Sequence, residues 1–177
     1  MQKLFYFSFI LMLALFSCKK ESTPAPGPPV ISFGSFTTTN GINGVITFNF
    51  TDPDGDIGLH QEDTTGSYSK TGVGYYDFYM RYYYKNYLGN FVTYYHQFNT
   101  TPNPLSDSLI FGYRIPFVTN NIKSKTLDGQ IIVNLNGYKP YFNYNDSISD
   151  FRFEFWIYDR ALHKSNVVTT PEFHTPY

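Results

Sequence analysis

The chain has 177 residues, a formal net charge of −1 and an apolar fraction of 42%. Only 15% of its residues are charged, whereas 17 tyrosines, 18 phenylalanines and one tryptophan make it rich in aromatic rings. This length suffices for one domain with a substantial core, and the composition argues against long disorder and coiled coil. The near-neutral charge argues against a nucleic-acid partner, because phosphate binding needs clustered lysines and arginines.

The first segment is typical of a secretory signal. Residues 4–16 are almost wholly apolar and follow a short, weakly basic start. A helix of this length spans only about 20 Å, which is too short to cross a bilayer core of about 30 Å. The single cysteine, Cys18, follows this apolar run, and four prolines stand between residues 23 and 29.

This arrangement resembles a bacterial lipoprotein signal, in which the cysteine is lipidated and becomes the first mature residue. The resemblance implies a signal peptide over residues 1–17, a lipid on Cys18 that anchors the protein to a membrane, and a proline-rich tether over residues 18–29. Residues 19–22 resemble the start of lipoproteins from the Bacteroidota, which implies an outer-membrane lipoprotein of the cell envelope and leaves exposure at the cell surface open. The alternative is an ordinary secretory signal with an incidental cysteine.

The remaining residues, 30–177, predict one all-β domain. Apolar residues recur with a period of two, and glycine, proline, asparagine and aspartate bound these runs. Such strands have one apolar and one polar face, so we expect a single antiparallel β-sandwich of about seven to nine strands. The expected strands lie near residues 31–38, 45–51, 75–84, 91–99, 109–117, 131–135, 151–158 and 166–174.

Two segments carry a resemblance to a family of folds. Residues 155–173 (FWIYDRALHKSNVVTTPEF) resemble the closing hairpin of immunoglobulin-like and cadherin-like bacterial modules. Residues 48–59 (FNFTDPDGDIGL) resemble the acidic loop after the second strand of those modules. Residues 113–117 and 127–129 are similar to segments of Bacteroidota lipoproteins. The resemblance implies an immunoglobulin-like sandwich in a surface setting and implies no activity.

The acidic run after residue 51 predicts either a metal site or a plain turn. Alternating carboxylates can converge on one hard cation, and calcium takes six to eight oxygen ligands. The calcium loop that lies between two helices is excluded, because Ile57 stands where that loop needs glycine. The cadherin-like resemblance implies an ion at the end of the domain. The candidate calcium ligands are Asp52, Asp54, Asp56 and Asp159, with Glu62 and Asp63 as further donors. Aspartate, proline and glycine also favour ordinary turns.

The strand expected over residues 75–84 carries tyrosines on both faces. Tyr76 and Phe78 are expected in the core, whereas Asp77 is expected to face solvent. The residues expected to form an exposed row, spaced about 7 Å apart, are Tyr75, Tyr79 and Tyr83. Such a row is a candidate ligand-binding surface for a sugar or a protein. The alternative is ordinary strand composition, since tyrosine is common in strands.

No motif in the chain predicts catalysis. The histidines have no metal-binding spacing, and the chain contains no nucleophile elbow, phosphate-binding loop or dinucleotide fingerprint. We therefore expect no enzyme, and a membrane-anchored module that binds or scaffolds an envelope protein. A glycan-binding accessory lipoprotein is the first alternative, and an unrecognised hydrolase is the second.

Overall fold

The computed structural model describes residues 25–39, 43–93, 110–118, 126–135 and 150–174. The expected signal peptide, Cys18 and part of the tether lie outside these residues, as do residues 94–99 of one expected strand. Within the described ranges, no helix is long and apolar enough to span a bilayer.

The described residues form strands and one short 3₁₀ turn, η1 (Gly66–Tyr68). The strands are β1 (Val30–Thr39), β2 (Asn43–Asp52), β3 (Phe78–Lys85), β4 (Phe91–Thr93), β5 (Ile110–Tyr113), β6 (Leu127–Leu135), β7 (Asp150–Ile157), β8 (Val168–Thr169) and β9 (Phe173–His174). This arrangement confirms the all-β class that the alternating pattern predicts.

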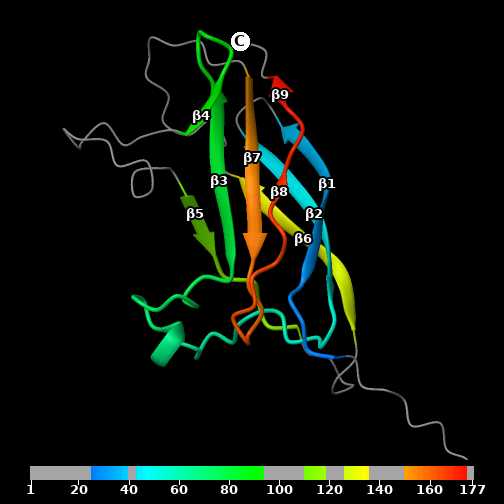
Figure 1. The fold of residues 1–177 in the computed structure, drawn as a ribbon, viewed down its shortest axis with the longest axis vertical. Coiled ribbons are helices and arrows are strands. Elements are labelled where there is room, and N and C mark those ends of the chain that lie inside the picture. The colour runs from blue at the N-terminus through cyan, green and yellow to red at the C-terminus, as the bar shows by residue number, and fades with distance from the viewer. Residues whose placement is uncertain (1–24, 40–42, 94–109, 119–125, 136–149, 175–177) are drawn as a thin grey trace, which may run out of the picture.

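The strands form two antiparallel sheets (Figure 1). One sheet has the order β1-β2-β6. In the other, β4-β3-β7-β8 form the main path, while β5 also pairs with β3 and β9 also pairs with β7. The two central strands of this second sheet, β3 and β7, are distant in sequence and pair from Phe78↔Ile157 to Tyr84↔Phe151.

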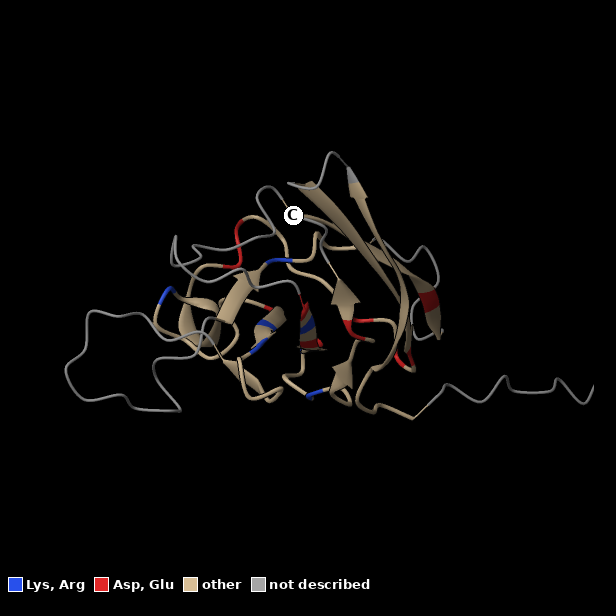
Figure 2. Ribbon diagram, turned by 90° about the horizontal axis from the view of Figure 1, so that it is seen from above, with Lys and Arg blue, Asp and Glu red and all other residues tan. Residues whose placement is uncertain are grey.

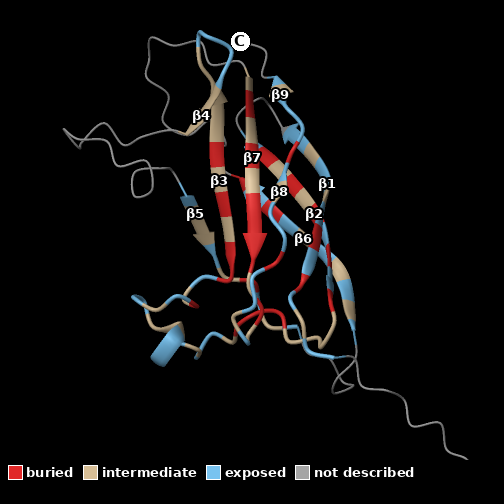
Figure 3. Cartoon of the chain, in the orientation of Figure 1, coloured by how far each residue is buried: buried red, intermediate tan, exposed pale blue. Residues whose placement is uncertain are grey.

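The core lies between the two sheets and combines aromatic rings with aliphatic side chains. Alternate residues of β2, β3 and β7 are buried, as the red bands of Figure 3 show. At its centre the Phe48 ring lies 5.1 Å from the Phe78 ring and 4.9 Å from the Phe155 ring, between centroids. Packed ring pairs of this kind contribute about 0.5–1.5 kcal/mol beyond the burial of their surface. The period-two pattern therefore predicted the inward faces of β2 and β7 well.

The start of β3 differs from the prediction. The strand begins at Phe78, and the preceding residues belong to a loop. Tyr76, expected in the core, is 38% exposed, and Asp77, expected in solvent, is only 2% exposed. Alternation applies only within a pleated strand, so it cannot assign faces to residues that precede the strand. The backbone of Asp77 instead joins two elements: its N–H donates to Tyr113 and its carbonyl accepts from Tyr158.

Two ion pairs connect neighbouring segments on the outer face of the six-stranded sheet. Arg81 contacts Glu154 at 3.0 Å, and Lys85 contacts Glu172 at 2.6 Å. In Figure 2 blue and red bands lie next to one another on this sheet. Arg152 and Lys164 make no ion pair among the described residues; the first lies over the Phe91 ring and the second over the Trp156 ring.

A side chain from the opposite sheet fixes the first residues of β1. The Asn166 amide donates to the Ile31 carbonyl at 2.9 Å, and its Oδ1 accepts from the Ile31 N–H at 2.8 Å. One side chain thus makes both hydrogen bonds that a neighbouring strand would make. It attaches β1 to the segment between β7 and β8.

Replacing Asn166 with alanine should lower the free energy of unfolding by about 2 kcal/mol, because two hydrogen bonds of about 1 kcal/mol each are lost. Urea denaturation measures this change. Asn134→Ala, at an exposed position of β6, is the control. An equal loss of stability in both variants would contradict the role given to Asn166.

Candidate metal centre

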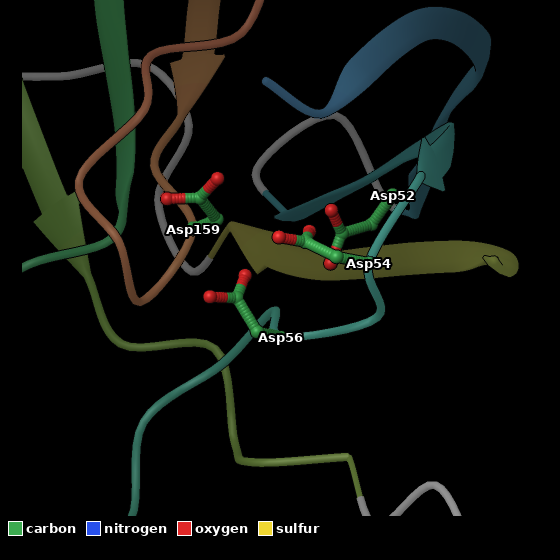
Figure 4. A group of neighbouring side chains, drawn as sticks. All are labelled: Asp52, Asp54, Asp56 and Asp159. Atoms are coloured by element: carbon green, nitrogen blue, oxygen red, sulfur yellow. The ribbon is translucent and has the colours of Figure 1, made fainter. Parts of the chain in front are cut away.

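Four aspartates meet at one end of the sandwich, where the two sheets come together. Asp52 is the last residue of β2, and Asp54 and Asp56 lie in the turn that follows. Asp159 comes from the other sheet, just after β7. One carboxylate oxygen from each lies within 4.8 Å of the others, and Figure 4 shows the side chains grouped around a common space. This cluster can hold a metal ion.

Two glycines give the acidic turn its shape. Gly55 has a φ of 70° and Gly58 a φ of 89°, in the left-handed region that favours glycine. Gly58 also lies against a neighbouring segment, since a Cβ there would be 2.5 Å from the Pro116 carbonyl oxygen. The chain can therefore turn tightly enough to direct Asp54 and Asp56 towards the end of β7.

Asp52 is the most unusual member of the cluster. It is 0% exposed, and neither of its carboxylate oxygens has a hydrogen-bond partner among the described residues. The Oδ1 atoms of Asp54 and Asp56 are also buried without a partner there. Burying an unpaired charge costs several kcal/mol. An ion-free site must therefore protonate or tolerate strong repulsion.

The pKa values reflect this strain. Burial, followed by the charges of Asp56 and Asp54, raises the pKa of Asp52 to about 7. Burial and the nearby Asp159 charge raise the pKa of Asp56. A cation among these carboxylates would reverse both effects, because it favours the charged form of each group.

Asp159 is held by its own turn. It is 1% exposed, and its Oδ1 accepts from the His163 N–H at 2.7 Å. Its Oδ2 lies 2.8 Å from Nδ1 of the His163 ring. The hydrogen bond to this carboxylate raises the pKa of His163. Each carboxylate oxygen has two lone pairs, so Asp159 can still offer one to a metal ion.

Arg160 connects the acidic turn to the long loop that follows this turn in the chain and contains Asp63. Its backbone N–H donates to the Asp56 carbonyl at 3.3 Å, and its Nη1 contacts Asp63 Oδ2 at 2.5 Å. Its guanidinium lies 5.5 Å from the centroid of the Phe117 ring, and the Tyr68 hydroxyl donates to its carbonyl. The hydrogen bond from Arg160 lowers the pKa of Asp63. Asp63 therefore serves as the partner of Arg160 and does not join the cluster.

A second buried carboxyl lies near this end of the domain. Asp77 Oδ1 accepts from the Ile115 N–H at 2.7 Å, while its Oδ2 is buried without a hydrogen-bond partner among the described residues. Burial raises the pKa of Asp77 to about 7. This group was missed because the sequence placed it on an outer face.

The expected tyrosine row is only partly regular. Tyr79 and Tyr83 lie on the outer face of β3, but Tyr75 precedes the strand. The Tyr79 ring is parallel to Trp156 within 6°, with centroids 5.5 Å apart. The Tyr83 hydroxyl donates to Glu154 at 3.2 Å. Tyr76, expected in the core, instead contacts the rings of Tyr75 and Tyr79.

A groove of about 280 Å³ lies between β6 and the segment that follows β5. Its described lining is mainly apolar and contains no carboxylate; it consists of Phe78, Tyr113, Arg114, Ile115, Pro116, Ile131, Ile132, Val133 and Asn134. The Arg114 guanidinium is directed at loop carbonyls, since it donates to those of Tyr75, His60 and Asp63. The groove therefore lacks, in its described part, the paired acids that a glycoside hydrolase needs.

A scan against protein-family models and searches of curated proteins and solved structures found no match to this chain.

Proposed function

We propose that this chain is a non-catalytic binding or scaffolding module of the bacterial cell envelope. In this proposal it has an immunoglobulin-like sandwich, a lipid on Cys18 anchors it to the outer membrane, and calcium fastens its two sheets together. The observation that carries the calcium site is Asp52, which is fully buried and lies among three other carboxylates, and whose two oxygens have no hydrogen-bond partner among the described residues.

The number of protein carboxylates in the cluster supports calcium over magnesium. One oxygen from each of four aspartates lies within 4.8 Å of the others. Calcium takes six to eight oxygen ligands, whereas magnesium keeps several of its waters and is usually held by one or two carboxylates. A set made only of carboxylates favours hard cations over zinc or copper, which prefer nitrogen and sulfur ligands.

The placement of the ligands supports a structural role for this ion. Asp52 ends a strand of one sheet and Asp159 follows a strand of the other, so one ion would bridge both layers. Several inward oxygens are already shielded from water. An enclosed ion of this kind stabilises a fold, whereas a catalytic metal keeps an open coordination position for a substrate.

The tether enters at the same end of the sandwich. A Cβ on Gly27 would lie 3.9 Å from Cγ of Pro53, which stands between two of the candidate ligands. Under the proposed anchoring, calcium would therefore stiffen the end of the domain nearest the membrane.

Calcium should raise the melting temperature of this protein relative to a chelator. At about 100 times its dissociation constant, a ligand adds about 2.7 kcal/mol, which corresponds to roughly 5–10 °C for a domain of this size. Calorimetry with calcium, magnesium and chelator measures the shift, which we expect to be largest with calcium.

Two variants make this test specific. Asp52→Asn should abolish the calcium shift and, in chelator, melt at a higher temperature than the unaltered protein, because the buried repulsion is gone. Glu62, an expected further donor, is exposed and lies outside the group of four aspartates, so Glu62→Gln should retain the full shift. The proposed site is wrong if calcium has no effect, or if its effect survives in Asp52→Asn.

A further inference from the structure

The outer face of the six-stranded sheet carries an aromatic corner, which we define as Tyr75, Tyr76, Tyr79 and Trp156. Its base is the Tyr76 ring, which lies on Gly112 of β5. A Cβ on Gly112 would be 2.5, 2.7 and 2.9 Å from three adjacent carbons of this ring. Such similar distances mean that the face of the ring, and not its edge, covers the glycine. Tyr76 is nevertheless 38% exposed.

Two further tyrosines make edge-type contacts with this base. The Tyr79 ring is inclined at 86° to the Tyr76 ring, with centroids 6.3 Å apart. The Tyr75 ring is inclined at 72° to it, with centroids 4.7 Å apart. Trp156 is 8% exposed and supports Tyr79 by parallel stacking, so this side of the corner is fixed before any ligand arrives.

The cations around the corner are each engaged with another group, which suits a neutral ligand. Arg81 is paired with Glu154, the Arg114 guanidinium donates to loop carbonyls, and the Lys164 ammonium lies over the Trp156 ring, 4.7 Å from its centroid. The Tyr79 hydroxyl donates to the Val73 carbonyl at 3.4 Å, which leaves its oxygen free to accept another hydrogen bond. The corner therefore combines the partly exposed Tyr76 ring with the phenol groups of Tyr75 and Tyr79.

We infer that the aromatic corner is a binding site for a neutral carbohydrate. The C–H face of one pyranose ring stacks on Tyr76, and its hydroxyls reach the phenol oxygens of Tyr75 and Tyr79. A tyrosine ring has this combination of apolar face and polar tip, and a sugar ring has the complementary one. This inference rests on the proposed binding function and gives that function a ligand class.

Affinity electrophoresis in gels that contain a soluble β-glucan, a mannan or a xylan tests this inference. A gel that contains alginate provides the comparison with an acidic polysaccharide. We expect at least one neutral polysaccharide to retard the protein. Tyr76→Ala should weaken that binding at least tenfold. Gly112→Ala should weaken it similarly, because the new methyl group displaces the Tyr76 ring while every aromatic residue remains. Tyr87→Ala is the control, since Tyr87 is 94% exposed in the turn between β3 and β4.

Calcium-dependent melting of the same samples separates the two proposals. A protein that shows the calcium shift but no retardation by any neutral polysaccharide overturns the carbohydrate site and leaves the proposed metal site intact. Retardation by alginate alone, or full binding by a folded Tyr76→Ala variant, also overturns the carbohydrate site. Binding of a neutral polysaccharide without a calcium-dependent shift in melting temperature supports the carbohydrate site and contradicts the proposed metal site.

Discussion

Replacing Asp77 with asparagine should flatten the pH dependence of stability and stabilise the protein above pH 7. Burial raises the pKa of this carboxyl from 3.8 to about 7. Between these values the folded protein binds more protons than the unfolded chain, so stability falls as the pH rises through this window. At about 1.36 kcal/mol per pH unit, the ionised group costs up to about 4 kcal/mol above pH 7.

Urea denaturation at pH 5 and pH 8 measures this effect. Saturating calcium should be present, so that the acidic cluster remains ionised at both values. The asparagine variant keeps an acceptor for the Ile115 N–H and carries no charge. Asp128→Asn, at an exposed position of β6, should leave the pH dependence as it is. Equal stability of the unaltered protein at pH 5 and pH 8 would show that burial does not destabilise the ionised form of Asp77.

Removing the Arg160–Asp63 pair should weaken calcium binding by roughly ten- to a hundredfold, as is typical when groups that orient metal ligands are lost. Arg160 holds the Asp56 carbonyl through its backbone and Asp63 through its side chain, so the pair attaches the acidic turn to the end of β7. Without it, the turn must be ordered when the ion binds. The variant combines Arg160→Gln with Asp63→Asn, because this double change leaves the net charge unaltered.

Isothermal titration calorimetry with calcium measures the affinity, at a temperature at which every variant is folded. The control combines Arg81→Gln with Glu154→Gln, which removes an ion pair of similar exposure from the outer face of the sheet. Its calcium affinity should not change. If both double variants bind calcium as the unaltered protein does, Arg160 has only a structural role.

The sequence predicted most of the fold, because its main signal is local. Ile46, Phe48 and Phe50 alternate with polar neighbours, and all three are buried as expected. The spacing of Asp52, Asp54 and Asp56 also indicated their convergence, since one short turn contains them. These features depend on residues close together in the chain, which periodicity and turn chemistry describe well.

The features that the sequence did not predict depend on contacts between distant segments. Asp63 meets Arg160 across 97 positions of the chain, and no spacing rule connects them. Tyr76 has its position because the paired strand β5 presents Gly112 at that point of the sheet. The burial of Asp77 depends on where β3 begins, and strand ends are the least predictable part of an alternating pattern.

The attachment of β1 has a mechanical consequence for a tethered protein. Under the proposed anchoring, the strand begins where the tether enters, and it pairs antiparallel to β2 from Val30↔Thr51 to Thr39↔Asn43, with a bulge between Phe33 and Ser35. A pull on the tether therefore acts along β1 and shears its backbone hydrogen bonds together, instead of unzipping them one at a time. The Asn166 amide holds the residue next to the point where the force enters. Tension from a moving partner would therefore meet the resistance of the whole strand at once.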